Sequence, residues 1–401
     1  MNFLKDDKNH VILSPLTPPE VKKSLESYIN DTLSLKSHIL LATSGTSQKK
    51  TSSTIKSAVL KKEAILLSAK TVNDFIGSNS KDCWLSCLPR HHIASLGIYA
   101  RALLSGSKVI DIYSYKSKWS QLRFLDAIDS HNVTLSSLVP TQVYDLVKNK
   151  VQAPSSLKCL FVGGGALSET LFFEARRLGW PLFVSYGMTE TASQIATSHY
   201  EALSFLEGAP YLKILNHVSL RDENNRLKIK SKSLLSYYVF LNQNICTHTS
   251  PVEDGFFKTE DSVDLKKKGY LRFLNREGDE IKISGERVSL RELKKVFMEE
   301  KLKLKFPDTV SLYPYKTKRE GMVMSLLVPQ KDISTLSEDD LKSVIKNFNM
   351  KVMPYEKIRR LLYVKDKVYT ELFKLKQTIG ENDILENREL KVKKRIDYEK
   401  A

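Results

Sequence analysis

The amino-acid sequence predicts an α/β protein with two domains. We expect a large N-terminal domain of mixed and parallel sheets flanked by helices, with a small β-barrel-like element, and a small α+β C-terminal domain. A chain of 401 residues that is 41% hydrophobic can bury a large core in two domains. Apolar runs of strand length alternate with helical patterns up to residue 194, and β-rich alternation follows. A new domain begins near residue 280, which gives domains at residues 1–279 and 280–401.

The elements of the first half follow from hydrophobic spacing and from cap residues. Apolar residues recur at helical intervals in residues 18–35, and Ser168 and Gly179 are suited to begin and close a helix. The predicted helices are residues 18–35, 57–75, 100–104, 124–129 and 168–179. The predicted strands are residues 39–42, 84–89, 108–113, 157–162 and 181–184.

The second half of the sequence has a different pattern, which begins with β-rich alternation. Residues 227–239 alternate and are rich in β-branched and aromatic side chains, after a turn at residues 222–225. Ser289 and Glu292 form a capping-box pattern at a helix start. The C-terminal domain is expected to contain strands at 309–313 and 322–328, helices at 292–302 and 337–347, and a charged, solvated end at 386–401.

Composition narrows the function classes. The net charge of +17 comes from 63 Lys and Arg against 46 Asp and Glu, spread along the chain as short clusters. This spread favours a surface that attracts anionic small molecules over a dedicated nucleic-acid footprint. The first 13 residues lack the apolar core of a signal peptide, and no apolar run approaches bilayer length. Four cysteines make no disulfide framework, so we expect a cytoplasmic, reduced protein without stable membrane insertion.

Four potential zinc ligands lie close together in the sequence. They are Cys83, Cys87, His91 and His92. Their spacing differs from the two separated ligand pairs of common structural zinc sites. Cys83 and Cys87 also border an apolar, strand-like run, which favours buried thiols over a metal site.

The segment 184–194 is the strongest candidate for chemistry. It follows an apolar strand, and open parallel sheets bind ligands where strands end. Tyr186 can stack on a base, Thr189 can bind a phosphate oxygen, and Glu190 can hold Mg²⁺, which prefers carboxylate and phosphate oxygens. The competing interpretation is a strand end followed by an ordinary helix cap.

Two further strand ends carry phosphate-compatible or flat-ligand features. Residues 43–50, Thr-Ser-Gly-Thr-Ser-Gln-Lys-Lys, combine hydroxyls, one glycine and two lysines, which can surround a polyphosphate. The glycines at 163–165 follow a predicted strand and allow a flat ligand close to the backbone. A flexible surface loop and a tight turn are the respective alternatives.

These stretches together resemble the adenylate-forming, or acyl-CoA synthetase, superfamily. Tyr-Gly-Met-Thr-Glu-Thr-Ala-Ser-Gln at 186–194 resembles its Y-G-x-T-E core, and residues 43–46, 138–142, 259–261 and 275–285 resemble further motifs in family order. The Thr-Glu-Thr-Ala-Ser-Gln form is most similar to the o-succinylbenzoate–CoA ligases of menaquinone biosynthesis. The resemblance implies an acid–thiol ligase that uses ATP, Mg²⁺ and CoA and a mobile C-terminal domain.

The resemblance also implies roles for single residues. The implied catalytic residues are Thr189, Glu190, His92 and Lys374, with Glu190 as the metal ligand. The implied cofactor-binding residues are Thr43, Ser44, Gly45, Thr46, Lys49, Gly164, Gly165, Tyr186, Gly187, Met188, Asp261, Arg276, Lys282 and Gly285. The Asp261 carboxylate suits two ribose hydroxyls, because it can accept two hydrogen bonds.

The sequence departs from the family pattern at both ends of the predicted site. Gln48 replaces the second glycine of the phosphate loop, and Thr51 stands at its lysine position, where Lys49 or Lys50 can substitute. Phe373 replaces a glycine before Lys374, which leaves Lys376 as a second candidate. These departures leave two alternative functions open. One is another acyl- or aryl-CoA ligase of the superfamily, and the other is a degenerate nucleotide-binding protein. The carboxylate substrate and the oligomeric state stay open.

Overall fold

The structure is a computed structural model of the chain. It describes residues 2–43, 55–114, 119–165, 167–199, 205–206, 209–276, 280–283, 286–317, 321–366 and 384–390. The chain divides into two compact units, Met1–Arg276 and Glu277–Ala401. The division lies three residues before the boundary expected from the sequence.

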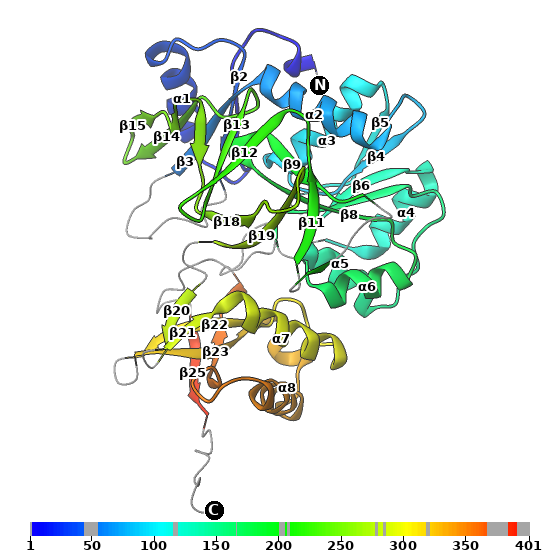
Figure 1. Ribbon diagram of the computed structural model, residues 1–401, viewed down its shortest axis with the longest axis vertical. Helices are drawn as coiled ribbons and strands as arrows, with labels where there is room; N and C mark the ends of the chain where they lie inside the picture. Colours follow the sequence, from blue (N-terminus) through cyan, green and yellow to red (C-terminus); the bar gives the residue numbers. More distant parts are fainter. Residues whose placement is uncertain are drawn as a thin grey trace, which may run out of the picture. The chain divides into compact units, whose positions relative to one another are not determined.

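A mixed sheet forms the centre of the first unit (Figure 1). Its parallel part contains β5 (Lys108–Asp111), β4 (Cys83–Ser86), β6 (Leu135–Leu138), β7 (Cys159–Val162) and β8 (Leu182–Met188), in that spatial order. Its antiparallel part continues with β9 (Ser193–Thr197), β11 (Ala209–Ile214), β19 (Tyr270–Arg276) and β18 (Asp261–Asp264), and β10 (Phe205–Leu206) pairs with β11. The direction of pairing changes between β8 and β9, which are the strands of the segment singled out above.

Helices cover both faces of the parallel part. One face carries α2 (Lys62–Ile76) and α3 (Ile93–Ser105), and the other carries α4 (Gln121–His131), α5 (Pro140–Lys148) and α6 (Glu169–Arg177) (Figure 1). As predicted, Ser168 caps α6 by accepting a hydrogen bond from the Leu171 N–H at 3.2 Å, and Gly179 follows its end with φ +84°. Among the residues that the structure describes, every helix is too short or too polar to cross a bilayer.

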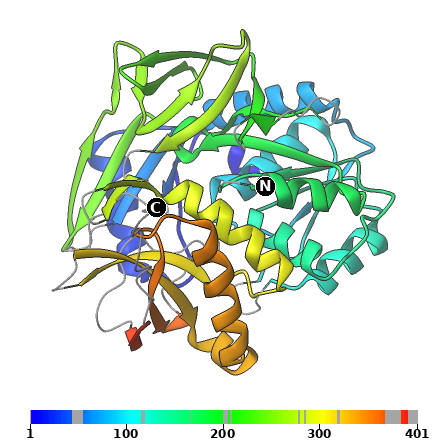
Figure 2. The ribbon, with the colours of Figure 1, turned by 60° about the horizontal axis from the view of Figure 1, so that its bottom comes forward.

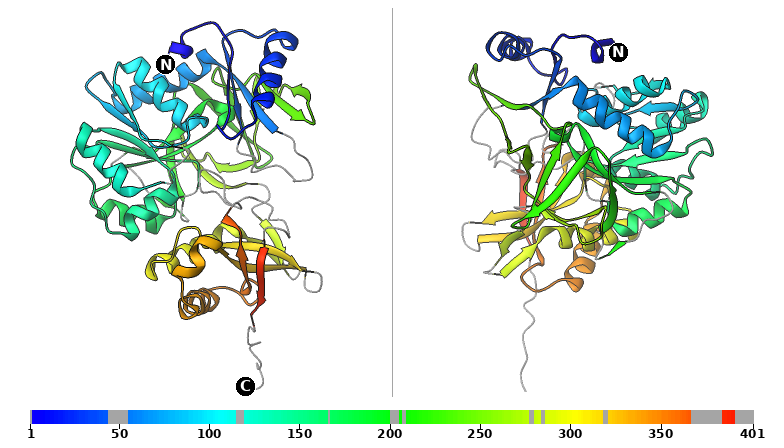
Figure 3. Two further views of the ribbon diagram at one scale, coloured as in Figure 1. Left: turned by 180° about the vertical axis from the view of Figure 1, so that it is seen from behind. Right: turned by 45° about the horizontal axis from the view of Figure 1, so that its top comes forward.

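A second sheet of the first unit contains the N-terminal strands. Its order is β1 (His10–Ile12), β2 (His38–Ala42), β3 (Ile55–Lys61), β14 (Tyr237–Asn242) and β15 (Ile245–Thr249). The predicted helix at 18–35 is α1 (Pro19–Ser27) with a π-helical turn (Tyr28–Thr32), and it packs on this sheet (Figure 3) through Leu25 and Ile29 against Val239. The short 3-10 turn Asn2–Leu4 precedes β1.

The prediction of a helix at 57–75 is wrong over its first five residues. Residues 57–61 belong to β3, which pairs with β2 on one side and with β14 on the other. Two strand partners satisfy its backbone groups, and this tertiary pairing overrides a local pattern that also fits a helix. The helix begins only at Lys62.

The third sheet corresponds to the predicted barrel-like element. It is antiparallel, with the order β12 (Val218–Glu223), β13 (Arg226–Ser231), β17 (Phe256–Lys258) and β16 (Val252–Glu253). Its end strands do not pair with each other, so the sheet is open within the described residues. Asn224 and Asn225 join β12 to β13 with φ of +55° and +60°, a turn conformation that suits asparagine.

The second unit is a small α+β unit. It contains the antiparallel pair β20 (Glu280–Ile283) and β21 (Glu286–Ser289), then α7 (Leu290–Lys303), β22 (Ser311–Thr317), β23 (Gly321–Pro329), a 3-10 turn (Gln330–Thr335), α8 (Glu338–Lys351), β24 (Ile358–Val364) and β25 (Ile384–Glu389). The helices α7 and α8 lie side by side (Figure 2), where the rings of Phe297 and Phe348 meet at 5.8 Å. The last four strands form a sheet in chain order.

The expected solvated end at 386–401 is only partly correct. Residues 384–389 form the edge strand β25, which pairs antiparallel with β24. The side chains of residues 385–389 are exposed, which explains why composition alone suggested a solvated tail. Ser289 caps α7 as predicted, accepting a hydrogen bond from the Glu292 N–H at 3.3 Å.

Candidate active site

Asp261 is the centre of a buried polar cluster. It lies opposite Arg276 in the register of β18 and β19, and its side chain is fully buried. Arg276 binds it with both ends of the guanidinium: Nε donates to Oδ1 at 2.5 Å and Nη2 to Oδ2 at 3.0 Å. Tyr186 Oη, from β8, donates to Oδ2 at 2.6 Å. Three predicted site residues from three separate motifs therefore meet at Asp261.

The cluster limits the predicted role of Asp261 as an acceptor for two ribose hydroxyls. A carboxylate offers about four acceptor positions, and three are in use. The Arg276 side chain is 38% exposed, so it is the member of this pair that a ligand reaches first. Its bond to Asp261 raises the pKa of Arg276, and burial, followed by the neighbouring Asp261 charge, raises the pKa of Tyr186. Both side chains therefore keep their protons at neutral pH.

Glu190 lies in the 3-10 turn Thr189–Thr191, between β8 and β9. Its carboxylate Oε1 accepts a hydrogen bond from Tyr238 Oη at 2.8 Å, and its backbone oxygen accepts one from the Leu235 N–H at 2.9 Å. Within the described residues, Oε2 has no hydrogen-bond partner. A half-buried carboxylate with one oxygen held and one available fits a magnesium ligand, since Mg²⁺ takes one or two protein carboxylates and otherwise binds water and phosphate.

Gly187 is required by the backbone around it. The register of β8 and β9 shifts between Tyr186 and Gly187, and a Cβ on Gly187 would lie 2.0 Å from the Ser193 backbone oxygen. The strand β8 therefore continues through Gly187, and the bulge lies opposite it on β9. The Thr191 hydroxyl is buried and holds the turn by donating to the Ser193 oxygen at 2.8 Å.

The glycine turn after β7 lies against β8. Gly164 has φ +76°, a conformation that favours glycine. A Cβ on Gly163 would lie 2.5 Å from Ser185 Oγ, and a Cβ on Gly165 would meet Pro140 at 3.5 Å. The strands β7 and β8 are neighbours, so the glycine turn and the segment 184–194 lie at adjacent strand ends.

His92 is a helix-terminal residue. It precedes α3, and its backbone oxygen accepts hydrogen bonds from the N–H groups of Ser95 and Leu96, each at 3.1 Å. Its ring lies 4.6 Å from the ring of His91, which is the more buried of the two. The nearby Cys87 thiol contacts the Ser137 carbonyl at 3.6 Å, and burial raises its pKa.

Several predicted site residues lie outside the described residues. They are Ser44, Gly45, Thr46, Lys49, Gly285, Lys374 and the alternative Lys376. Lys282 is described only as a backbone position in β20, and the side chains of Met188 and Thr189 are half-buried at the end of β8. Thr43 is described: its N–H and its Oγ1 donate to the Lys56 backbone oxygen at 2.9 and 3.1 Å.

Arg101 is a buried cation that the sequence interpretation missed. Its Nη2 donates to Gln194 Oε1 at 2.5 Å, and its guanidinium lies 5.5 Å from the Trp84 ring and 5.3 Å from the Phe161 ring. Burial lowers its pKa to about 10. Within the described residues it has no carboxylate partner, and Arg101 Nε and Gln194 Nε2 find no acceptor. A single charge in the apolar helix at 93–105 was the signal available in the sequence.

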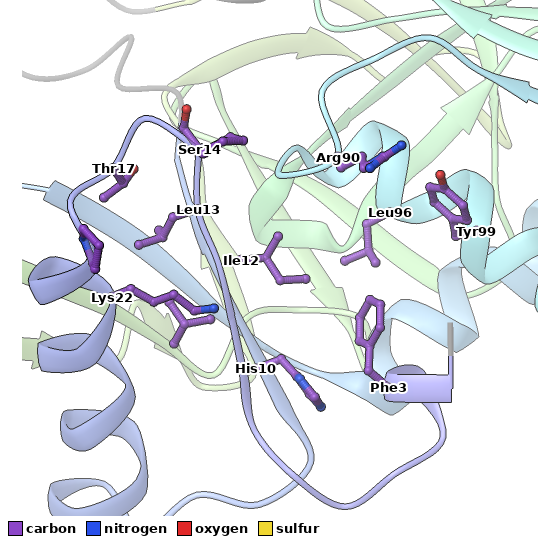
Figure 4. Close-up of a pocket in the computed structure, with 13 residues that line it drawn as sticks. Phe3, His10, Ile12, Leu13, Ser14, Thr17, Lys22, Arg90, Leu96 and Tyr99 are labelled. Carbon is purple, nitrogen blue, oxygen red and sulfur yellow. The ribbon is translucent and has the colours of Figure 1, made fainter. Parts of the chain in front are cut away.

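A cavity of about 570 Å³ lies between the N-terminal segment and α3 (Figure 4). Phe3, Ile12 and Leu96 form part of its wall, and none of the predicted site residues lines it. Charged groups on its wall are already paired: Arg90 binds Asp111 at 2.5 Å. His10 and Lys22 likewise contact Asp6 at 3.0 Å and Glu26 at 3.7 Å, so the cavity offers no evident anion site.

Residues 40–230 match the family model of AMP-binding enzymes, so this part of the chain is an AMP-binding family domain. Among curated relatives, the 2-succinylbenzoate–CoA ligases of Bacillus velezensis and Bacillus subtilis are 31% and 30% identical over 222 and 232 residues. These matches cover 53% and 56% of this chain and 44% and 46% of the relatives. The chain thus spans about half the length of the curated relatives it matches.

Solved structures confirm the predicted α/β fold. The O-succinylbenzoate coenzyme A synthetase of Bacillus subtilis in complex with AMP has a TM-score of 0.65 and 24% identity, covering 84% of this chain and 68% of that chain. The same enzyme in complex with ATP and magnesium ion has a TM-score of 0.62, with the same identity and coverage. The match of residues 40–230 to the AMP-binding family model bears out the resemblance inferred from the motifs.

Proposed function

We propose that this protein is an ATP-dependent carboxylate–CoA ligase that adenylates o-succinylbenzoate and transfers the acyl group to CoA. The observation that carries the proposal is the contact between Tyr186 Oη and Asp261 Oδ2 at 2.6 Å, in the cluster completed by Arg276. It joins two motifs 75 residues apart in sequence. Both motifs are among those that resemble the adenylate-forming superfamily.

The first half-reaction forms a bond between a substrate carboxylate oxygen and the α-phosphorus of ATP, and pyrophosphate leaves. Arg276 and the N–H groups near the glycine turn would stabilise negative charge, which is the main requirement of phosphoryl and adenylyl transfer. Glu190 would hold Mg²⁺, which neutralises charge on the phosphate oxygens. In the second half-reaction the CoA sulfur attacks the acyl carbon, the thiol proton is lost to solvent, and AMP leaves.

Arg101 favours a dicarboxylate substrate. o-Succinylbenzoate has two carboxylates, and only one is adenylated, so the other stays anionic and requires a partner. Arg101 is a buried cation with unused donors on itself and on Gln194. A buried cation is costly until an anion pairs with it, so this pair is suited to the second carboxylate. Gln194 is the last residue of the Thr-Glu-Thr-Ala-Ser-Gln motif.

Pyrophosphate release tests the proposed function. With ATP and Mg²⁺, we expect o-succinylbenzoate to drive release above a panel of fatty and cinnamic acids, and added CoA to yield the thioester. Activity on the other acids alone would point to another ligase of the family. ATP binding without release for any acid would point to a nucleotide-binding protein.

A substitution at Arg101 tests the substrate. We expect Arg101→Met to lower kcat/KM for o-succinylbenzoate by roughly 10²–10³-fold, because breaking a buried charge pair costs about 3–5 kcal/mol. The same variant should lose less than about tenfold on a monocarboxylate analogue that lacks the second carboxylate. Arg90→Met, an exposed arginine bound to Asp111, is the matched control and should change neither rate. Equal losses on both substrates would contradict the role of Arg101.

A further inference from the structure

We propose that Lys56 is a phosphate-directed cation of this site and that Tyr238 positions the Glu190 carboxylate beside it. The inference rests on the proposed function and adds two residues to it. The sequence pattern had pointed to Lys49 or Lys50 for this charge, and Tyr238 had no predicted role.

Lys56 stands where the predicted phosphate-binding segment meets the sheet. The strand β3 begins at Ile55, and the segment that starts at Thr43 leads into it. Thr43 donates two hydrogen bonds to the Lys56 backbone oxygen, so the two ends of this segment are joined at Lys56. Lys56 is therefore the hydrogen-bonded neighbour of Thr43, the first residue of the predicted phosphate-binding motif.

The ammonium of Lys56 is held on an aromatic face. In the register of β3 and β14, Lys56 is opposite Phe240 and Ala58 is opposite Tyr238, so Lys56 and Tyr238 are diagonal neighbours on one face. The Nζ atom lies 3.7 Å from the centre of the Tyr238 ring, a cation–π contact. Figure 1 shows β3 and β14 side by side. The ring fixes the cation without neutralising it.

Lys56 keeps its charge available. Within the described residues no carboxylate lies within 4 Å of its ammonium, although Glu190 and Glu260 are near enough to oppose the lowering of its pKa by burial. A lysine ammonium is a compact point charge that suits a phosphate oxygen. Tyr238 Oη donates to Glu190 Oε1 at 2.8 Å, which leaves the second carboxylate oxygen for a metal. One tyrosine therefore organises both a cation for the phosphates and a carboxylate for the metal.

Binding measurements separate a phosphate-directed role from a structural one. We expect Lys56→Met to weaken ATP binding by about ten- to a hundredfold, the range of one or two charge-assisted hydrogen bonds, while AMP binding changes less than about twofold. Lys61→Met removes the same charge from the exposed end of β3, where Lys61 lies 3.5 Å from Glu63, and should change neither affinity. Lys56→Arg keeps the charge and should bind ATP within about threefold of wild type.

Tyr238→Phe tests the second half of the proposal. It keeps the ring under Lys56 and removes the hydroxyl, so ATP binding without metal should stay within about twofold. The Mg²⁺ concentration that gives half-maximal ATP affinity should rise about five- to tenfold, because Glu190 loses the hydrogen bond that orients it. An unchanged Mg²⁺ dependence overturns the role of Tyr238.

Calorimetric titrations of the full chain with ATP and AMP decide between the outcomes. The proposal for Lys56 is overturned if Lys56→Met binds ATP like wild type, or if it loses ATP and AMP affinity equally. A wild type that binds ATP but releases no pyrophosphate overturns the proposed function and leaves this proposal standing. A wild type that does not bind ATP overturns both.

Discussion

Two Tyr–Asp–Arg clusters with similar chemistry occur on β18 and β19. In one, Asp261 binds Arg276 and Tyr186. In the other, Asp264 Oδ2 accepts hydrogen bonds from Tyr211 Oη at 2.7 Å and from Arg272 Nη2 at 2.9 Å. Both aspartates are buried, yet only the first belongs to the predicted nucleotide site. The second cluster is therefore an internal control for the first.

Alanine at each aspartate should separate binding from stability. We expect Asp261→Ala to weaken ATP binding by about tenfold or more, since Arg276 and Tyr186 lose the carboxylate that orients them. Asp264→Ala should bind ATP within about twofold of wild type. Its free energy of unfolding should fall by about 3–5 kcal/mol because the buried Arg272 loses the Asp264 carboxylate, and that of Asp261→Ala by less because Arg276 is partly exposed. Calorimetry and urea unfolding measure the two quantities. An equal loss of ATP affinity in both variants would show that Asp261 has no specific role in the nucleotide site.

The lowered pKa of Asp264 predicts how the stability of the protein changes at acid pH. The Lys266 N–H, Tyr211 and Arg272 lower the pKa of Asp264 to about 2. A carboxylate whose pKa is lowered by folding stabilises the protein above its unfolded pKa of about 3.9 and loses this contribution as the pH falls towards 2. The stability difference between wild type and Asp264→Asn should therefore shrink from pH 5 to pH 2 in urea titrations. A constant difference would show that the ionised form is not favoured by folding.

At the scale of elements, the bulge between β8 and β9 sets the position of the predicted catalytic turn. The turn that carries Glu190 follows the shifted pair at Tyr186 and Gly187. The extra residue is Ile195 on β9, between the partners of Tyr186 and Gly187, and such a residue bends its strand and redirects the side chains around it. Gly187 permits this because it has no Cβ, for which the Ser193 carbonyl oxygen on β9 would leave no space.

Gly187→Ala should disturb both the fold and the site. The new Cβ would meet backbone atoms that cannot move aside, so we expect a loss of about 1–3 kcal/mol in the free energy of unfolding and weaker ATP binding. Gly165→Ala is the matched control for stability, because its Cβ would meet the Pro140 side chain at an ordinary 3.5 Å. Thermal unfolding compares the two variants. Wild-type stability in Gly187→Ala would contradict the required close approach.

At the scale of the whole molecule, the two units are expected to divide the chemistry. The nucleotide-site residues whose side chains the structure describes lie in the first unit, whereas Lys282 and Lys374 belong to the second. A lysine ammonium can bridge a substrate carboxylate and the α-phosphate. If the second unit contributes it only to adenylation, the two half-reactions should respond differently to substitution.

Lys374→Ala should lower pyrophosphate release by about 10²–10³-fold, the loss typical of one deleted electrostatic contact in a transition state. Thioester formation from supplied acyl-adenylate should stay near wild type. Gly285→Leu should show the reverse pattern, with pyrophosphate release near wild type and thioester formation lowered. Lys376→Ala is the control for register, and a defect there instead of at Lys374 would show that the motif is read two residues out of place. No effect at either lysine would favour a nucleotide-binding protein.

The sequence predicted most elements that depend on local signals. Ser168 identified the start of α6, the asparagines at 224 and 225 lie in the predicted turn, and hydrophobic spacing located α1. The motif order also predicted the family and the fold class. Caps, turns and helical spacing are encoded within a few residues, so they can be read without knowing the partners.

Tertiary structure decided what depends on distant partners. The strand at 55–61 and the edge strand at 384–389 exist because other strands pair with them, and a short apolar or charged run does not reveal such pairing. The same holds for the site: Arg101 became a candidate only when its burial beside Gln194, with no carboxylate partner in the described part of the chain, was visible. Lys56, Tyr238 and Glu190 come from three elements far apart in sequence. Ionic contacts and burial depend on which side chains are close in space. These side chains are far apart in the sequence, so only the fold brings them together.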